Sequence, residues 1–310
     1  MEEFADTTIL TLVRHSEKIL KREQKMLFAG RVLRENLAAG TKEIRDILRN
    51  RDKKYFVSFS VKRGKLRWLW ISSRIESGFF GDIVYLKAFY ISRGELGKGI
   101  LKRLISNARK YHKAGGVEIY LALCLRDKGA IAEFRNNGFT AALYGLAART
   151  AESLGYLSKL NPNIPAGYKI KPINFGKSLE EYLDLSVRAM KTDSTSATYN
   201  APASRLKKTY RSNIRLGVRE KAFGLYFKDK LVGEISLGKA KGAPDIGLIA
   251  GIGILPEHRG KGLSKLLYRK GLEWFRDNTR KIYVGQSSTR GVLGQAGKLK
   301  RRRTYVLMKG

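Results

Sequence analysis

The sequence predicts an α/β protein with two tandem domains, each a twisted mixed β-sheet flanked by helices. Its 310 residues suit two domains of about 100–200 residues each better than one. Hydrophobic residues make up 43% of the chain, with 13 Phe and 15 Tyr, so sizeable cores can form and global disorder is excluded. An apolar run, a glycine-rich turn and an amphipathic helix follow one another once in each half. A pattern repeated at half the chain length indicates a duplicated domain.

The first half is expected to begin with a short strand at 9–13 and two helices. The first helix would cover 17–37 and end near Gly40, and the second would begin with Thr41 as its N-cap and end at residue 50. Period-2 and β-branched runs then predict strands, and the turn leads into a helix. The expected strands are 55–61, 66–72, 83–91 and 117–125, and the helix is 100–112.

The second half follows a Pro- and Gly-containing stretch at 161–167, which is typical of a linker. The predicted domains are therefore 1–160 and 168–310. The second domain is expected to contain strands at 168–173, 223–227, 231–237, 246–255, 281–285 and 304–308, and helices at 178–190 and 204–214. A further helix follows the glycine turn, and a Ser- and Thr-rich loop at 191–202 would lie near an acceptor.

The best-defined motif lies at 246–276. A β-branched apolar run ends at Pro256, which has no N–H to give to a sheet. The turn Glu257-His258-Arg259-Gly260-Lys261-Gly262 follows, and a helix with Leu263, Leu266 and Leu267 on one face comes next. Glycines let the backbone approach a ligand closely, and the first N–H groups of a helix have no intrahelical acceptor. The turn therefore predicts an anion site.

This motif resembles the acyl-CoA loop of the GNAT N-acetyltransferases, and the β-α-α-β-β-β-α-β order resembles the topology of that family. Glu257 stands where the family pattern begins with Gln or Arg. The resemblance implies that the loop holds the pyrophosphate of acetyl-CoA and that the preceding strand separates from its neighbour to admit the pantetheine arm. The implied cofactor-binding residues are Gly253, Ile254, Leu255, His258, Arg259, Gly260, Lys261, Gly262, Leu263 and Ser264. The alternative is a glycine turn that only serves packing in another α/β protein.

The first half resembles a degenerate GNAT domain. Gly97 and Gly99 stand where Gly260 and Gly262 stand in the second half, but Leu96 replaces the loop arginine. The segment 130–139 resembles the closing helix of the family, where a Tyr often protonates the departing thiolate. Phe134 takes that place and has no proton to give. The first domain is therefore expected to be non-catalytic and to serve in docking.

Acetyl transfer to an amine requires a base, because an amine with a free pKa near ~10 is protonated at neutral pH. The candidates are Asp245, at the start of the strand, and Glu234, in a neighbouring strand. Asp245 could instead be a turn residue, and Glu234 could face solvent. No residue stands out as the acid. A backbone N–H within 251–255 could stabilise the charge that develops on the carbonyl oxygen.

The charge predicts a polyanionic partner. The 62 Lys and Arg residues outnumber the 27 Asp and Glu residues, which gives a net charge of +35. Coenzyme A needs few positive groups, so the surplus favours RNA or DNA, unless it only provides solubility or reflects a basic proteome. The expected nucleic-acid-binding residues are Lys207, Lys208, Tyr210, Arg211, Arg301, Arg302 and Arg303, with Tyr210 as a stacking residue.

Composition excludes several classes. A single cysteine, Cys124, cannot form an internal disulfide, and it and three scattered histidines predict no metal site. No apolar run reaches the ~18–20 residues of a membrane span, so an intracellular, cytoplasmic protein is expected. The sequence indicates no oligomeric state. The leading hypothesis is an acetyl-CoA-dependent N-acetyltransferase whose amine acceptor belongs to, or is presented by, a nucleic acid or ribonucleoprotein. The alternatives are a non-catalytic RNA- or DNA-binding module and a small-molecule amine N-acetyltransferase.

Overall fold

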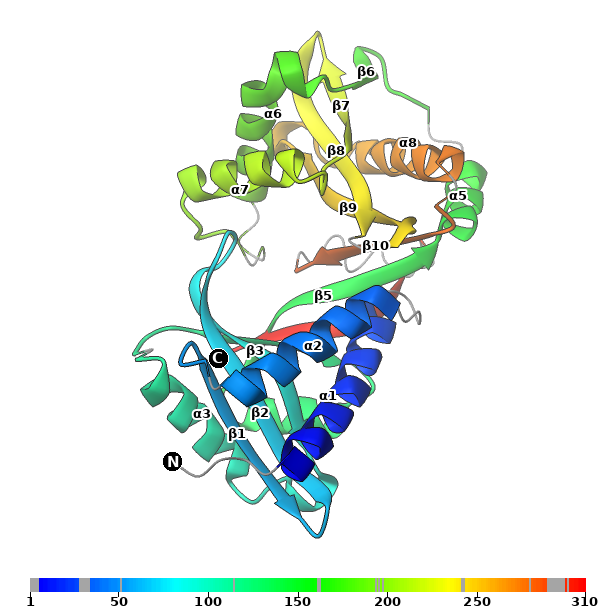
Figure 1. Cartoon of the computed structure of the whole chain (residues 1–310). Helices are drawn as coiled ribbons and strands as arrows, with labels where there is room; N and C mark the ends of the chain where they lie inside the picture. The colour runs from blue at the N-terminus through cyan, green and yellow to red at the C-terminus, as the bar shows by residue number, and fades with distance from the viewer. Residues whose placement is uncertain are drawn as a thin grey trace. The chain divides into compact units, whose positions relative to one another are not determined.

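A computed structural model describes residues 6–27, 34–50, 52–113, 115–160, 163–192, 194, 196, 198–240, 243–278, 280–288, 299 and 301–310 (Figure 1). The chain forms two compact units. Unit 1 comprises Met1–Ser77, Gly81–Ala142 and Thr304–Gly310, and unit 2 comprises Gly78–Phe80 and Leu143–Arg303. Residues 143–160, which precede the expected linker, thus belong to the same unit as the second half.

Unit 1 is a mixed sheet with the strand order β1-β2-β3-β4-β11 and helices packed against it. All its neighbouring strands are antiparallel except β3 and β4, which are parallel. Its strands are β1 (Tyr55–Lys62), β2 (Lys65–Ser77), β3 (Gly81–Ile91), β4 (Ile119–Cys124) and β11 (Arg302–Lys309). Its helices are α1 (Asp6–Leu27), α2 (Arg34–Asn50), α3 (Ile100–Tyr111) and α4 (Lys128–Asn136), with a 3₁₀ turn at Arg93–Glu95.

The start of the chain is helical, so the strand expected at 9–13 is wrong. Residues 9–13 belong to α1, which buries Leu12, Val13 and Ser16. Ile9, Ile19 and Leu20 pack against the same core. Apolar residues at spacings of three and four along the whole segment are typical of one helical face, and this period outweighs the β-branched composition of its first turn.

Helix α2 begins at Arg34 and runs through Gly40 and Thr41, so the helix end at Gly40 and the N-cap at Thr41 are also wrong. A Cβ atom at Gly40 would lie 3.2 Å from Leu20 Cδ1 of α1. Glycine therefore serves a close approach between two helices at this position. A local pattern cannot distinguish a glycine of this kind from one that ends a helix.

Unit 2 is a second mixed sheet, with the strand order β5-β10-β9-β8-β7-β6. Only β9 and β10 are parallel neighbours. Its strands are β5 (Thr140–Arg149), β6 (Tyr168–Pro172), β7 (Lys221–Phe227), β8 (Lys230–Ala240), β9 (Ala243–Ile254) and β10 (Ile282–Ser287). Its helices are α5 (Thr150–Lys159), α6 (Phe175–Met190), α7 (Ala203–Arg215) and α8 (Leu263–Asp277), with a 3₁₀ turn at Pro256–His258.

Hydrophobic clusters cover both faces of the unit 2 sheet. On one face α6 and α7 bury a cluster that contains Tyr182 and Leu206, and on the other α8 and α5 bury one that contains Leu267 and Leu157 (Figure 1). Adjacent residues of β7 contribute to opposite clusters, Ala222 to the first and Phe223 to the second. Each face of the sheet is therefore packed, as the alternation of side chains along a strand requires.

Each half of the chain ends in a strand that pairs within the other unit. Strand β5 belongs to the first half and pairs antiparallel with β10. Strand β11 belongs to the second half and pairs antiparallel with β4. Each unit therefore contains a mixed set of strands with helices packed on them, as expected, but the strands at the ends of the repeats are exchanged.

Candidate functional site

Strand β9 loses one of its two neighbours part of the way along its length. It pairs with β8 as far as Ile254, but with β10 only from Ile246 to Ile249, where Ile249 lies opposite Gly285. On its other side β10 pairs with β5 along its whole length, from Ile282 to Ser287, so β10 stays with β5 where it leaves β9. Within the described part of the chain, β9 therefore has no strand neighbour on this side from Ala250 to Ile254.

The gap leaves backbone groups without a ladder partner. The N–H of Leu255 donates to Val232 O of β8 at 2.9 Å. Because hydrogen-bonding direction alternates along an antiparallel strand, the N–H groups of Ile252 and Ile254 point to the side that β10 vacates. These two donors form an open edge directly before the glycine turn.

The glycine turn is open to solvent. Gly260 and Gly262 have φ values of +79° and +74°, in the left-handed region that glycine adopts without strain. A Cβ atom at either position would have no neighbour within 4 Å. Gly262 is the N-cap of α8, and among the described residues the amides of 260–264 donate no backbone hydrogen bond outside the helix. The first amides of a helix also have no intrahelical acceptor, so these groups can receive an anion.

Arg259 points back into the protein. Its Nε donates to Ile254 O at 2.7 Å, and its Nη2 donates to Ala189 O at 3.2 Å and to Thr192 Oγ1 at 2.6 Å. These bonds join the end of β9 to the end of α6. The interpretation of Arg259 as a phosphate ligand therefore gives way to a role as a tie that holds the turn.

Tyr168, the first residue of β6, contacts two residues of the turn. The sequence analysis did not identify it. Its hydroxyl lies 2.8 Å from His258 Nδ1 and accepts a hydrogen bond from Lys261 Nζ at 3.1 Å. The rings of Tyr168 and His258 also contact Phe227. His258 and Lys261 are thus placed by contacts with β6, at the edge of the sheet, which no local pattern signals.

Glu234 lies on β8, next to β9, and is buried, with 3% of its surface exposed. It is opposite Gly253 in the ladder between β8 and β9. Ser186 Oγ of α6 donates to its Oε1 at 3.5 Å, whereas Oε2 has no partner among the described groups. Burial raises the pKa of Glu234, while the nearby positive charge of Arg219 opposes this shift.

Asp245 is not brought to this place. It is exposed and lies before the stretch in which β9 pairs with β10. At about 3.3 Å per residue, roughly 16 Å of strand separates it from Ala250, where the gap begins. Of the two carboxylates expected as a base, only Glu234 lies beside the open part of β9.

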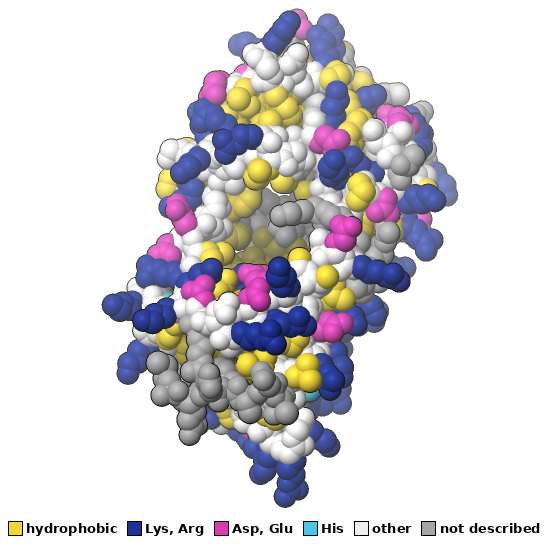
Figure 2. All heavy atoms as spheres, in the orientation of Figure 1, with side chains coloured by type: hydrophobic (Ala, Val, Ile, Leu, Met, Phe, Trp, Pro, Cys, Tyr) yellow, Lys and Arg dark blue, Asp and Glu magenta, His cyan; other side chains and the backbone are white. Residues whose placement is uncertain are grey.

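The residues expected to bind nucleic acid divide into three groups. Tyr210 and Arg301 are buried, so neither can stack on a base or reach a phosphate. Lys207 and Arg211 form ion pairs with Asp184 and Glu180 on α6. The exposed members without a described acidic partner are Lys208, Arg302 and Arg303. On the face shown in Figure 2, Lys and Arg side chains are scattered among acidic ones and do not form a single patch.

Tyr210 and Arg301 have structural roles instead. Tyr210 donates to Met190 Sδ at 3.2 Å. Arg301 Nη1 donates to the hydroxyl of Tyr268 at 2.9 Å, and its guanidinium lies over the rings of Tyr268 and Tyr283. Basic and aromatic residues interleaved in sequence are thus explained here by core packing.

The corresponding turn of unit 1 has the same glycine geometry but differs from the turn of unit 2 in a charged residue. Gly97 and Gly99 keep φ values of +77° and +69°. Glu95, two residues before Gly97, is 6% exposed and forms ion pairs with Arg67 and, at 3.7 Å, with Lys98. His258 is the residue two positions before Gly260. A carboxylate therefore stands two residues before the first turn glycine of unit 1, where unit 2 has a histidine.

Large aromatic side chains lie beside the strand separation of unit 1. Strand β3 pairs with β4 only at Val84 and Tyr85, so it too separates from its parallel neighbour. The ring of Phe89 packs there against Phe134 of α4, with centroids 4.9 Å apart, and against Trp70 at 6.1 Å. Phe134 is fully buried. Aromatic side chains thus pack against one another next to the separated part of β3.

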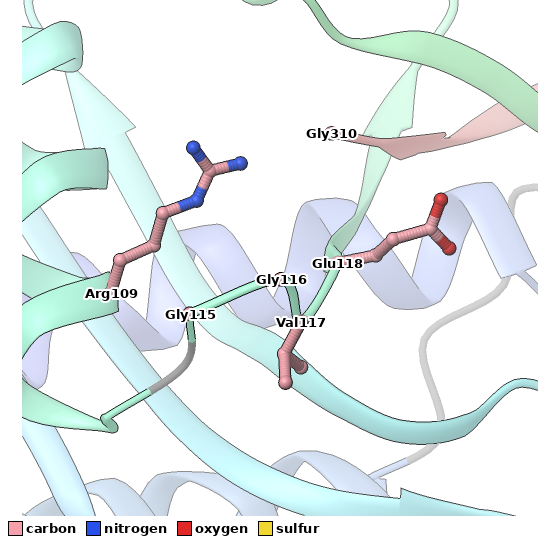
Figure 3. Close-up of a pocket in the computed structure, with 6 residues that line it drawn as sticks. All are labelled: Arg109, Gly115, Gly116, Val117, Glu118 and Gly310. Atoms are coloured by element: carbon pink, nitrogen blue, oxygen red, sulfur yellow. The ribbon is translucent and has the colours of Figure 1, made fainter.

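The cavities of unit 1 lie elsewhere. One of about 260 Å³ is lined by Arg109, the segment 115–118 and Gly310 (Figure 3). The carboxylate of Glu118 points toward β11 in Figure 3 and is engaged by Lys309 and Tyr120. A second, of about 360 Å³, lies between α1 and α2. Neither contains the residues of a glycine turn, so the site is placed by backbone geometry rather than by cavity volume.

Comparison with known families gives the same region. Residues 186–290, from α6 to just beyond β10, match the Acetyltransferase (GNAT) family. This match lies within the C-terminal half of the chain, around the open part of β9 and the glycine turn. The members of this family are acetyltransferases, which generally use acetyl-CoA. A comparison with curated proteins found no significantly similar sequence.

Solved structures show that the tandem GNAT fold covers nearly the whole chain. A GCN5-related N-acetyltransferase from Sphaerobacter thermophilus is 12% identical, with a TM-score of 0.58 over 86% of this chain and 85% of that one. A tandem GNAT protein from the clavulanic acid biosynthesis pathway is 15% identical, with a TM-score of 0.54 over 95% of each chain. At these identities the likeness establishes the fold, and the expected pair of GNAT-like domains is confirmed.

The described residues contain no group of three or more His, Cys, Asp or Glu side chains that could hold a metal ion. None of the described helices is both long and apolar enough to cross a membrane.

Proposed function

We propose that unit 2 binds acetyl-CoA along the open edge of β9 and transfers the acetyl group to an amine. The observation that supports this most directly is the continuity of two features. The N–H groups of Ile252 and Ile254, which have no strand partner among the described residues, lead into the open turn at Gly260–Gly262. This turn leads into the N-terminus of α8. One edge can therefore hold an extended amide-bearing chain and the phosphates at its end.

Acetyl-CoA supplies a thioester, whose carbonyl carbon the amine attacks as the C–S bond breaks and the thiolate leaves. The amides of 260–264 and the helix dipole of α8 would hold the pyrophosphate. Lys261, placed by Tyr168, adds a positive charge beside it. The N–H of Ile252 would donate to the thioester oxygen, which gains negative charge during the reaction.

Glu234 is the residue we propose as the base that takes the proton from the attacking amine. It lies opposite Gly253, and its pKa is raised by burial, which makes it a better proton acceptor than an exposed carboxylate. Its unpartnered Oε2 leaves one oxygen available for that proton. We identify no acid for the thiolate among the described side chains, so solvent is proposed as the proton source.

The acceptor is proposed to be an amine on, or presented by, a polyanion such as RNA or a ribonucleoprotein. The support for this step is the net charge of +35 together with the exposed Lys208, Arg302 and Arg303. A free small-molecule amine is the competing acceptor, and it predicts turnover without nucleic acid. A cytoplasmic location is part of the same proposal, since one cysteine suits a reducing compartment.

Calorimetric titration with acetyl-CoA tests the site. Gly260→Asp places a carboxylate in the phosphate site, and binding should be lost. Gly97→Asp is a matched control, because Gly97 has nearly the same φ and equally open surroundings in unit 1, so backbone strain is similar in both variants. Unchanged affinity in Gly260→Asp, or equal losses in both variants, would contradict the assignment.

A further inference from the structure

A buried arginine contacts β9, and neither the sequence motifs nor the reaction described above uses it. Arg219 precedes β7 and is 2% exposed. Its Nη1 donates to Tyr182 Oη of α6 and, at 2.7 Å, to Ser236 Oγ of β8. Its guanidinium lies 4.2 Å from the centre of the Tyr210 ring of α7. One side chain thus joins α6, α7 and β8.

The remaining contact of Arg219 is with β9, at the point where the gap begins. Its Nη2 donates to Ala250 O at 3.1 Å. Ala250 is the extra residue of a β-bulge, because Gly251 pairs with Ser236 while Ile249 pairs with the next residue, Leu237. It is also the first residue of β9 beyond the pairing with β10. A bulge redirects the strand that follows it.

The strand is shaped to accept this arginine. A Cβ atom at Gly251 would lie 3.0 Å from Arg219 Nη2 and 2.9 Å from Ser236 Oγ, so any side chain would displace the guanidinium. Unit 1 has an equivalent bulge at Lys87, where Ala88 pairs with Ile71 while Leu86 pairs with Ser72. The residue after that bulge is an alanine, and Lys87 forms an ion pair with Glu43. The bulge belongs to both units, whereas the arginine under a glycine belongs to unit 2.

We propose that Arg219 is a positioning residue for acetyl transfer: it fixes the peptide group of the bulge at Ala250 and thereby the direction of the N–H of Ile252. This inference rests on the proposed function of β9. Two donors of one rigid guanidinium hold Ser236 and Ala250 together, so the bulge is locked to the neighbouring strand. The acetyl carbonyl is the group that meets the N–H nearest the bulge, whereas the pyrophosphate meets the turn at 260–264.

Comparing acetyl-CoA with coenzyme A separates these two contacts, because coenzyme A makes the phosphate contacts without the acetyl carbonyl. In Arg219→Lys the affinity for acetyl-CoA should fall about 3- to 10-fold, the value of one hydrogen bond, and the affinity for coenzyme A should stay unchanged. Arg280→Lys is the matched control. Arg280 is also buried in unit 2 and donates to a strand carbonyl, Gly238 O, at 3.0 Å, but it lies away from the gap.

Gly251→Ala is the second variant, because it pushes the guanidinium away without removing the charge, and it should change the affinity ratio in the same direction. Thermal unfolding shows that each variant is folded. Infrared difference spectra with acetyl-CoA labelled at the carbonyl carbon give an independent measurement. The C=O stretch should lie below its free value in the original protein and move back toward it in Arg219→Lys.

Equal losses for acetyl-CoA and coenzyme A, or no change in either, would overturn the positioning role. The same is true if Arg280→Lys changes the ratio as much as Arg219→Lys does. If the unaltered protein binds neither ligand, the proposed function itself fails, and this outcome is distinct from a normal wild-type titration with an unaffected variant.

Discussion

The tie formed by Arg259 gives the clearest distinction between the sequence motif and the structure. A loop arginine beside glycines suggests a phosphate ligand, and its removal would then abolish binding and leave the fold intact. The structure instead places its Nε and Nη2 on Ile254 O, Ala189 O and Thr192 Oγ1. Arg259→Ala should therefore mainly lower stability.

The expected magnitude follows from these three hydrogen bonds. Each is worth about 0.5–1.5 kcal/mol net, and because the side chain is largely exposed, water replaces part of the loss. We expect Arg259→Ala to cost about 1–3 kcal/mol, and the midpoint of thermal unfolding to fall by about 2–10 °C for a unit of this size. The affinity for acetyl-CoA should fall less than about tenfold, since the glycine turn remains.

Calorimetric unfolding and acetyl-CoA titration, performed on the same samples, measure both quantities. Arg269→Ala is the control, because Arg269 is a partly exposed arginine of α8 whose described partner is Glu273 in an i,i+4 pair. Such a pair is worth about 0.3–0.5 kcal/mol. Arg259→Lys keeps the charge but not the paired donors, so it should resemble Arg259→Ala in stability. If Arg259→Ala loses acetyl-CoA binding, keeps its unfolding midpoint, and Arg259→Lys restores binding, then Arg259 is a phosphate ligand and the reasoning is refuted.

Three further predictions concern the base, the number of sites and the polyanion. Burial raises the pKa of Glu234, so this group favours the fold below its unfolded pKa near 4.5, and that contribution is lost as pH rises through the folded pKa. In Glu234→Gln, the free energy of unfolding by denaturant should no longer show this loss between pH 4 and 8. The variant should also turn over an identified acceptor about 10²–10⁴-fold more slowly. An unchanged pH dependence of the unfolding free energy would contradict the prediction. Titration should give one acetyl-CoA per chain, because Glu95 lies in the turn of unit 1 and Phe89 beside its strand separation, and two equivalents would show that they do not exclude it. Binding of a single-stranded homopolymer RNA should weaken steeply between about 50 and 200 mM salt. Replacing Lys208, Arg302 and Arg303 by Ala should reduce the salt slope by about one for each phosphate that the variant no longer neutralises. A salt-independent affinity would remove the polyanion from the proposal.

Local signals in the sequence were sufficient for most of the sheet and for the glycine turn. The hairpin of β7 and β8, the strand β9, the turn and α8 follow the expected order, because alternation, Pro256 and the two glycines act within a few residues. The strand prediction at the start of the chain was wrong because β-branched residues were weighted above a helical period that extends to Leu20. The exchange of β5 and β11 has no local signal, since pairing between distant strands is decided by tertiary packing.

The site was predictable to the same extent. The turn is recognisable in the sequence because proline restricts the backbone and glycine permits positive φ values that other residues avoid. Arg219 and Tyr168 act on the site through contacts across 31 and 90 residues, to Ala250 and His258, so nothing near the motif could indicate them. The prediction that Tyr210 binds nucleic acid was wrong because its neighbours in the sequence were misleading. Its basic neighbours on α7 suggested a surface, but a helix alternates buried and exposed faces, and Tyr210 lies on the buried one.

The two units together show that the geometry of the fold is not sufficient for the proposed reaction. Both have a strand that separates from its parallel neighbour, a bulge at the separation, and two glycines at positive φ before a helix. The differences are the side chains placed in that frame. Unit 1 has Glu95 in the turn and Phe89 beside the strand separation, whereas unit 2 has His258 held against Tyr168, and glycine at 251 and 253. An anion site requires a space without a fixed negative charge, and an acyl site requires a strand edge without large side chains. Unit 2 meets both requirements, so its turn, rather than the duplicated fold, is the reason to place acetyl transfer there.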